Sequence, residues 1–262
     1  VLPGMDHALV LNAIREYDAS GKYDVIVYDG AGDQTTLRML GMPEVLSWYM
    51  RRFRQVFANS DLGRTVMPLL QPIAASVLNV SWTGDIFEQP ATQQVNNILD
   101  QGKAAVADPN RVIAYLVTTP EDGAIATAKY LWGAAQQAGL TVGGLIVNRT
   151  TDPATLSQDF APLPVSTVPN EPVNDWQPLI NGLPNFDQAT QMPPSIAVNV
   201  AERKVSLFLP GFDRKQVKLT QSGPELTIEA GDQRRNIFLP AELSGKPVTG
   251  AKFQDGFLII SF

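Results

Sequence analysis

The stretch that decides the fold is "RVIAYLVTTPEDGAIATAKYLWGAAQQAGLTVGGLIVNR", residues 111–149. Its two ends, 111–120 and 140–149, are continuous apolar runs, which are typical of strands buried on both faces of a parallel sheet. The alanine-rich piece between them begins with acidic residues and ends at Gly139, as helices do. Strand, helix and strand at this spacing predict a βαβ unit and therefore an α/β domain.

Two other apolar runs extend this sheet. "YDVIVYDG" (23–30) predicts a further buried strand, and "PVSTVP" (164–169) predicts a shorter one. Residues 43–107 interrupt the rhythm with apolar helical patterns at 44–58 and 64–78. Such helices either bury into the main core or form an insertion whose apolar faces bind a partner.

The C-terminal part has a different pattern. Residues 196–262 alternate apolar and polar side chains, as in Val205, Leu207 and Leu209, and glycines stand at turn positions. This part is predicted to be a small all-β sandwich. Before it, residues 151–195 hold nine of the 20 prolines and no basic residue. Proline excludes a long helix or a central strand, so 171–195 is interpreted as a linker.

Composition limits the class of protein. The 262 residues, 44% of them hydrophobic, suffice for one or two domains. A net charge of -6 argues against nucleic-acid binding. The chain has no cysteine, which rules out disulfides and thiolate metal sites within it and fits a reducing compartment. No apolar run is long enough to span a membrane.

One motif in the first part carries chemistry. In 25–40, "VIVYDGAGDQTTLRML", an apolar run ends in Asp29, and Gly32 follows three residues later. A carboxylate at the carboxyl end of a parallel strand can hold Mg²⁺, usually through water. A glycine there lets the backbone approach a phosphate. Asp29 and Gly32 are thus candidate catalytic residues, with Asp29 as the metal ligand; the alternative is a surface turn after a buried strand.

Residues 1–170 resemble the family of arsenite-pump-driving ATPases and of the ATPases that target tail-anchored membrane proteins. The resemblance rests on "LPGMDHAL" (2–9), "YDVIVYDGAGDQTTLRMLGMP" (23–43), "DPNRVIAYLVTTPEDGAIATAKYL" (108–131) and "GGLIVNR" (143–149). It implies a parallel-sheet, P-loop-NTPase-like fold of the SIMIBI type, with a helical insertion at about 43–107. Asp29, Ala31, Thr36, Leu37 and Arg38 match the family's switch II segment, whereas Gly30, Gly32, Asp33, Gln34 and Thr35 depart from it.

The same resemblance implies a binding site for ATP and Mg²⁺. Asn148 would bind the adenine edge, since an amide both donates and accepts; an Asn that caps a strand end is the alternative. Pro169 falls where the loop beside the adenine would lie. The insertion corresponds to a helical subdomain that forms, in a homodimer, a hydrophobic groove for client helices. The client-binding candidates are Met50, Phe53, Phe57, Leu70 and Ile73.

The expected phosphate loop is missing from the sequence. No G-x-x-x-x-G-K-[ST] segment occurs, and in the family it lies N-terminal to a segment like "GMD" (4–6). Because the chain begins at Val1, we infer that about a hundred residues of a complete protein lie outside it. This chain alone is expected neither to bind nor to hydrolyse ATP well.

Residues 196–262 resemble the α-crystallin domain of small heat-shock proteins. The resemblance rests on "LFLPGFDRKQVKLTQSGPELTIEA" (207–230), "RRNIFLPAEL" (234–243) and "AKFQDGFLIISF" (251–262). There is little room for a dimerisation strand and no Ile-x-Ile tail, so edge strands are expected to pack on the ATPase part or on another subunit. An ATPase of this family with such a domain resembles a branch of photosynthetic organisms, including cyanobacteria and plastids.

Two functions therefore stand as hypotheses. The first is an ATP-switched dimeric carrier or chaperone for hydrophobic helices, working in the cytoplasm or plastid stroma, with peripheral contact to membrane machinery. The second is a metal-oxyanion pump-driving ATPase. The absence of cysteine weighs against it, because those enzymes sense the metalloid through thiolates. An inactive structural relative is the third reading.

Overall fold

The computed structural model describes most of the chain, namely residues 5–58, 89–152, 154–170, 175–186, 191–231 and 233–262. At residues 5, 51–58, 89–92, 94 and 155 only the backbone is described. The chain divides into two compact units, residues 1–104 and 105–262, and each is described by itself. No helix in the described ranges combines the length and the apolar character needed to cross a bilayer.

The first unit is helical. It contains α1 (Met5–Ala19), α2 (Gln34–Ala58) and most of α4 (Gln89–Ala107), and α1 contacts α2. Helices α2 and α4 approach closely where a Cβ on Gly102 would lie 3.1 Å from the Pro43 ring. Met39 is buried there, and the Lys103 ammonium donates to Ser47 Oγ at 3.2 Å. The helix predicted at 44–58 is thus confirmed but begins ten residues earlier, at Gln34, whereas 64–78 lies outside the described residues.

The strand predicted at 23–30 is wrong. Residues 23–30 form no strand, and all of them are exposed; the exposed fraction of Val27 reaches 85%. A parallel strand is held by ladder hydrogen bonds to its neighbours. Among the strands that the structure describes, none includes residues 23–30. An apolar run without a ladder partner remains irregular.

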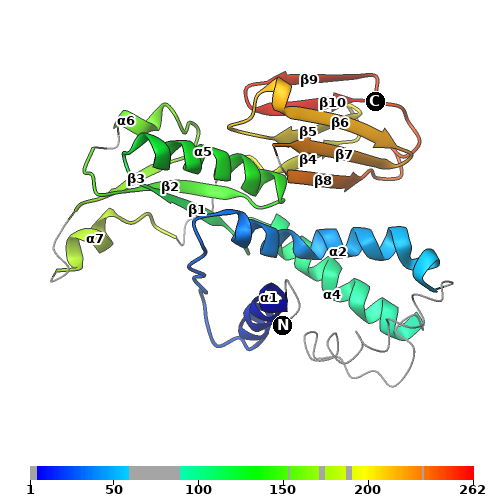
Figure 1. The fold of residues 1–262 in the computed structure, drawn as a ribbon, viewed down its shortest axis with the longest axis horizontal. Coiled ribbons are helices and arrows are strands. Elements are labelled where there is room, and N and C mark those ends of the chain that lie inside the picture. The colour runs from blue at the N-terminus through cyan, green and yellow to red at the C-terminus, as the bar shows by residue number, and fades with distance from the viewer. Residues whose placement is uncertain (1–4, 59–88, 153, 171–174, 187–190, 232) are drawn as a thin grey trace. The chain divides into compact units, whose positions relative to one another are not determined.

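The second unit begins with the predicted βαβ unit. Strands β1 (Ala114–Thr118), β2 (Val142–Asn148) and β3 (Val165–Val168) form a parallel sheet in the order β1-β2-β3. Helix α5 (Asp122–Gln137) connects β1 to β2, and α6 (Ala154–Ser157) lies between β2 and β3. Figure 1 shows α5 lying along this sheet. The α/β assignment of this part and its three strands are confirmed.

Two consecutive glycines in β2 make this sheet tight. A Cβ on Gly143 would overlap Ile113, and one on Gly144 would lie 3.2 Å from both Pro164 O and the Tyr115 ring. Glycine inside a strand commonly marks such a close approach. The side chains of Ile113, just before β1, and of Tyr115 in β1 therefore cover the surface that β2 leaves bare, which explains why "GG" does not break the strand.

The proline-rich linker contains a short helix, α7 (Gln177–Gly182). It packs against β3, where a Cβ on Gly182 would overlap the carbonyl of Thr167. The segment after it also contacts the sheet, because the Phe186 ring meets Tyr115 edge-on with centroids 4.9 Å apart. Within the described part of residues 171–195 the helix has only six residues, in line with the exclusion of a long helix by proline. The role of this segment as a linker stays a prediction.

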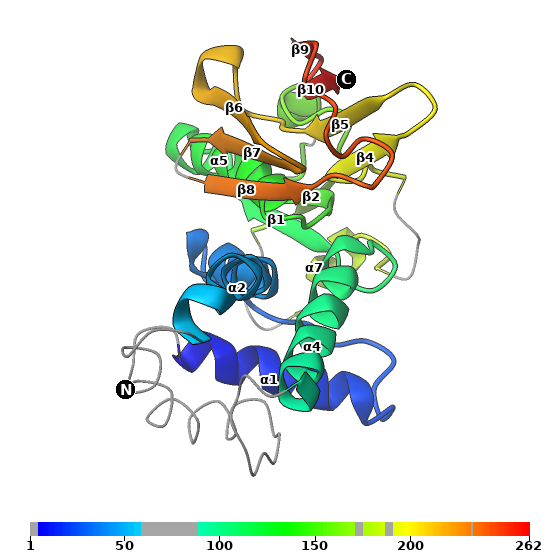
Figure 2. The same cartoon turned by 90° about the vertical axis from the view of Figure 1, so that its right-hand side faces the viewer.

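The C-terminal part is the predicted all-β sandwich. One sheet has the order β4-β5-β10-β9 and the other β6-β7-β8, with all pairs antiparallel (Figure 2). The strands are β4 (Ile196–Asn199), β5 (Lys204–Phe208), β6 (Val217–Ser222), β7 (Glu225–Ala230), β8 (Gln233–Phe238), β9 (Gly250–Gln254) and β10 (Phe257–Ser261), and a 3-10 turn η1 (Arg214–Gln216) precedes β6. Asp255 and Gly256 both have positive φ between β9 and β10, as a type I′ hairpin turn requires.

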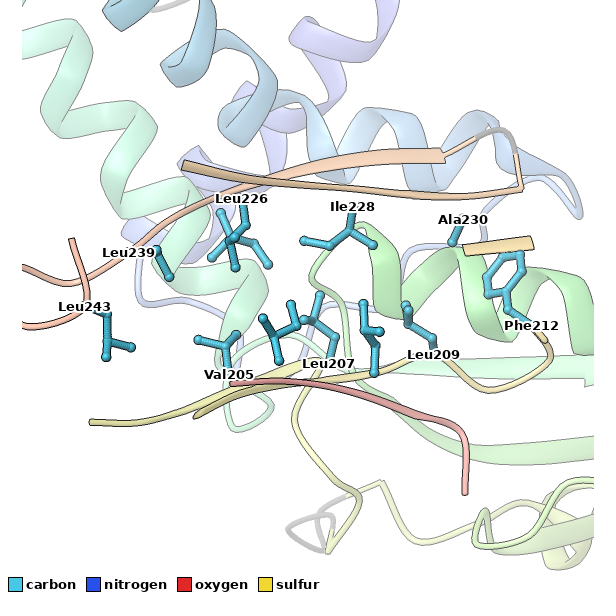
Figure 3. Close-up of a cluster of buried hydrophobic side chains, with 12 residues drawn as sticks. Val205, Leu207, Leu209, Phe212, Leu226, Ile228, Ala230, Leu239 and Leu243 are labelled. Atoms are coloured by element: carbon cyan, nitrogen blue, oxygen red, sulfur yellow. The ribbon is translucent and has the colours of Figure 1, made fainter. Parts of the chain in front are cut away.

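Alternate side chains of the two sheets form one core (Figure 3). Val205, Leu207, Leu226 and Ile228 have no exposed surface, and each such side chain stabilises the fold by about 1.5–3 kcal/mol. Strand β4 departs from this pattern, because Val198 is 43% exposed. It lies on an edge strand, which is paired only with β5.

Candidate nucleotide site

The carboxyl ends of the parallel strands bring the predicted adenine residues together. Asn148 is the last residue of β2 and stands in register with Val168, the last residue of β3, so Pro169 follows directly beside it. The amide of Thr150 donates to Val168 O at 3.1 Å and ties the two strand ends together. Ligands of open α/β sheets bind at this edge.

The Asn148 side chain is half-buried and partly engaged. Its Oδ1 accepts from the backbone amide of Arg149 at 2.9 Å, and Arg149 has a φ of 63°. The side chain thus stabilises a left-handed turn at the strand end. No described residue accepts a hydrogen bond from its Nδ2, so this donor is available to a ligand. The two roles considered from sequence, a strand-end cap and an adenine contact, are compatible in one side chain.

The end of β1 adds a threonine pair to the same edge. Thr118 is buried and pairs in register with Val147, and its hydroxyl donates to Thr119 O at 3.3 Å. Helix α5 begins four residues later behind Glu121, whose side chain makes no capping hydrogen bond. The Glu121 side chain therefore accepts no hydrogen bond from the first backbone amides of α5. These amides can donate to a polar ligand or to water.

The predicted catalytic pair lies in the other unit. Asp29 and Gly32 are exposed and precede α2, and a Cβ on Gly32 would meet nothing within 4 Å. They belong to residues 1–104, and Asn148 and Pro169 belong to 105–262, so the two pairs occupy separate units. Their assignment to phosphate and Mg²⁺ stays a prediction. Among the described residues no group of three or more acidic or histidine side chains gathers into a metal site.

The turn between Asp29 and α2 is nevertheless held by contacts between residues close in sequence. Asp33 Oδ1 accepts from the Thr35 amide at 2.8 Å, as a residue capping a helix N-terminus does. That hydrogen bond lowers the pKa of the exposed Asp33 carboxyl below its usual value. A Cβ on Gly30 would lie 2.6 Å from Thr36 Oγ1, so the loop folds back against the first turn of the helix. Asp33 thus caps the start of α2, and Gly30 allows the loop to approach it closely; both residues depart from the family's switch II.

The client-binding candidates are placed only in part. Met50 is half-buried on α2 and is preceded by exposed Val45, Leu46 and Tyr49. Phe53 and Phe57 lie on the backbone of α2, with side chains that are not described. Leu70 and Ile73 lie outside the described residues. The apolar stripe expected on this helix is therefore exposed at several positions.

Another set of buried polar residues escaped the sequence reasoning. Gln136, Gln137 and Arg235 are at most 7% exposed, at the place where α5 meets the β-sandwich. Polar residues of these types are usually at the surface, and nothing in their immediate sequence marks them as buried. A signal does exist in α5 itself, because the run Gly133, Ala134 and Ala135 presents only small side chains, over which a second layer can pack closely.

Fold and strand order define the class: a parallel α/β part followed by a small antiparallel β-sandwich. Residues 1–161 match the family described as "Anion-transporting ATPase", and residues 201–262 match the "HSP20-like domain found in ArsA". Since the first match covers more than half of the chain, the chain belongs to the anion-transporting ATPase family.

Relatives with both parts are similar along the whole chain. A putative arsenical pump-driving ATPase of Prosthecochloris vibrioformis is 25% identical over all of this chain and 71% of its own length. A protein of the same name from Chlorobaculum tepidum gives the same figures. The ATPase GET3 of Mycosarcoma maydis is 38% identical over 26% of this chain and 19% of its own. The resemblances predicted from sequence are thereby confirmed for both parts.

Proposed function

We propose that the chain works in an ATP-switched, homodimeric carrier that binds hydrophobic helical segments of other proteins. The observation that carries the proposal is the adjacency of Asn148 and Pro169 at the carboxyl edge of a parallel sheet, in a member of an ATPase family. An amide with a ligand-accessible donor, next to a proline on the neighbouring strand, suits the flat edge and the face of an adenine ring.

The family implies that nucleotide is used together with Mg²⁺. Asp29 would hold the ion through water, as a lone carboxylate does, and Gly32 would let the backbone approach the terminal phosphate. The exposed position of Asp29 fits a water-mediated contact. When bound, the nucleotide would supply the difference in binding free energy that favours one dimer arrangement over another.

The helical unit supports the carrier role. Its helix α2 exposes Val45, Leu46 and Tyr49, and Met50 is half-buried beside them. Contiguous exposed apolar side chains on a soluble unit commonly mark a surface that binds another apolar segment. Phe53 and Phe57 continue the same helix. Leu70 and Ile73 remain candidates from sequence and lie outside the described residues.

Adenine recognition is tested with Asn148→Asp. Aspartate keeps the oxygen that accepts from the Arg149 amide but loses the donor. We expect ATP affinity to fall about tenfold, which corresponds to about 1.4 kcal/mol for the lost hydrogen bond. Asn236→Asp on β8 serves as the control and should bind like the unmodified protein. Calorimetry with ATP on the whole protein gives the affinities. Equal binding by Asn148→Asp and Asn236→Asp would refute the assignment.

Client binding is tested with Met50→Asp. A charge at this position should abolish capture of a biotinylated transmembrane-helix peptide, because burying an unpaired carboxylate is strongly unfavourable. Asn97→Asp, on an exposed position of α4, adds the same charge as a control. Capture that survives Met50→Asp would place the client site elsewhere.

A second candidate, a metalloid pump-driving ATPase, is favoured by the similarity to two putative arsenical pump-driving ATPases. The chain has no cysteine to hold a metalloid by thiolates. ATP turnover that rises on addition of arsenite or antimonite, without any apolar peptide, would support this candidate over the carrier. A whole protein that binds no ATP at all would instead indicate an inactive relative.

A further inference from the structure

We propose that the HSP20-like domain acts within its own chain as a brace that holds α5 and the turn into β2. In this role it is a fixed third layer of the second unit. The face of the domain that meets α5 is occupied, so that face does not bind clients. The proposal concerns residues 105–262 and is independent of whether the strand ends bind nucleotide.

Helix α5 is covered on two sides. It packs on β1 and β2 with one side and against β8 with another (Figure 1). Its second half is buried without interruption from Trp132 to Gln137. A crossover helix of a three-layer α/β protein usually leaves one side to water. The small side chains Gly133, Ala134 and Ala135 instead allow a second layer to approach the backbone.

Glycines set the distance between the two layers. A Cβ on Gly133 would overlap Pro210 O and lie 2.5 Å from the Phe212 ring. From the other side, a Cβ on Gly211 would lie 2.6 Å from Lys129 O, and Gly211 has a φ of 80°. The Leu-Pro-Gly segment of the β-sandwich therefore lies directly on the helix backbone, at a distance that only glycine permits on both sides.

Hydrogen bonds fix the end of α5 to the sandwich. The Gln137 side chain donates to Ile228 O at 2.9 Å, and Arg235 Nη1 donates to Gln136 O at 3.1 Å. The Ser195 hydroxyl donates to Gly139 O at 3.2 Å. Each bond is buried and joins residues at least 56 positions apart in sequence. Together they hold the turn that leads from α5 into β2, the strand that ends at Asn148.

Aromatic packing completes this contact. The Trp132 ring stacks on Phe160 with centroids 5.9 Å apart and meets Phe208 edge-on at 5.8 Å. Phe160 belongs to the α/β part and Phe208 to β5, so one indole bridges the two layers.

The test uses a matched pair of glycines in α5. Gly133→Ala places a methyl group against Pro210 and Phe212, whereas Gly123→Ala places one where nothing lies within 4 Å. Alanine favours an isolated helix at both positions, so only contact with the second layer gives them opposite effects. Both variants are made in the whole chain, with a protease site inserted within residues 187–190.

After cleavage, size-exclusion chromatography at micromolar concentration shows whether the two fragments stay together. Fragments of the unmodified protein and of Gly123→Ala should co-elute, and those of Gly133→Ala should associate at least tenfold more weakly. The proposal is overturned if the unmodified fragments separate, or if Gly133→Ala associates as well as Gly123→Ala.

Hydrogen exchange on the uncut chains separates a brace from general loss of stability. In Gly133→Ala, amides of residues 136–142 should exchange faster, while the β5–β10 ladder inside the sandwich keeps its protection. Equal acceleration in both places would contradict the brace.

If Gly133→Ala does not fold, Arg235→Ala is compared with Arg234→Ala, its exposed neighbour on β8. Only Arg235→Ala removes the bond to Gln136 O, so only its fragments should separate more readily.

Discussion

Residues 23–30 and residues 142–148 are both apolar runs, but their structures differ. The second run is β2, with strands on both sides and every residue except the last buried. The first is an exposed irregular segment. Each contains three consecutive aliphatic residues, 25–27 and 145–147, so a short aliphatic run alone does not decide. A strand forms where neighbours supply both the ladder hydrogen bonds and the cover for its side chains.

The largest expected effect comes from shortening one side chain in each of the two runs. Leu145→Ala in β2 removes a side chain that is 1% exposed, and should lower the free energy of unfolding by about 2–5 kcal/mol. Val27→Ala removes one that is 85% exposed, and should change it by about 0.5 kcal/mol or less. Denaturant unfolding of both variants gives the two values. Similar losses would mean that residues 23–30 are buried in solution.

A third segment shows that a ladder can be replaced by a side chain. Residues 246–248 form no strand, but Gln221 on β6 donates to Lys246 O at 2.7 Å and accepts from the Val248 amide at 2.8 Å. One carboxamide thus supplies the donor and the acceptor that a neighbouring strand would offer. Val248 packs against the sandwich core as a result. Residues 23–30 have no comparable anchor within the described part of the chain.

Removing the Gln221 side chain tests whether it holds residues 246–248, with a smaller expected loss of stability. Gln221→Ala leaves two partly buried backbone groups without their partner and should cost about 1–3 kcal/mol of unfolding free energy. Gln254→Ala, at an exposed position of β9, should be close to neutral. Faster hydrogen exchange at the Val248 amide should accompany the loss in Gln221→Ala. An unchanged Val248 amide would show that the core contact of its side chain suffices to hold the segment.

The sequence could predict what local patterns determine. The apolar runs and helix ends around α5 predicted β1 and β2, and period-two alternation predicted the sandwich core at Leu207 and Leu226. The strand at 23–30 failed because its ladder depends on segments that are distant in sequence. The buried pairs Gln137–Ile228 and Arg235–Gln136 were missed for the same reason, since their members are 91 and 99 residues apart.

For the candidate site, Asn148 and Pro169 were assigned to adenine through the family resemblance, and that assignment stays a prediction. The register of β2 and β3 adds that the two residues stand at neighbouring strand ends. Asp29 depended on the strand that did not form. Its environment is therefore set by the loop before α2, and the capping role of Asp33 is the part that the structure adds.

The smallest expected effect tests how residues 30–33 are held without a strand. The hydrogen bond to the Thr35 amide lowers the pKa of Asp33, so the cap stabilises the start of α2 above the usual carboxyl pKa of 3.8 and is lost as pH falls through the lower folded value. The Thr35 amide resonance should therefore titrate with a midpoint below 3.8.

Asp33→Asn keeps an acceptor and should abolish this titration while retaining the helix start. Asp33→Ala should fray the first turn of α2 at every pH, which solution NMR would detect as faster exchange at Thr35 and Thr36. A Thr35 midpoint at or above the ordinary aspartate value would show that Asp33 is not the cap, and that the loop is as irregular at its end as in residues 23–30.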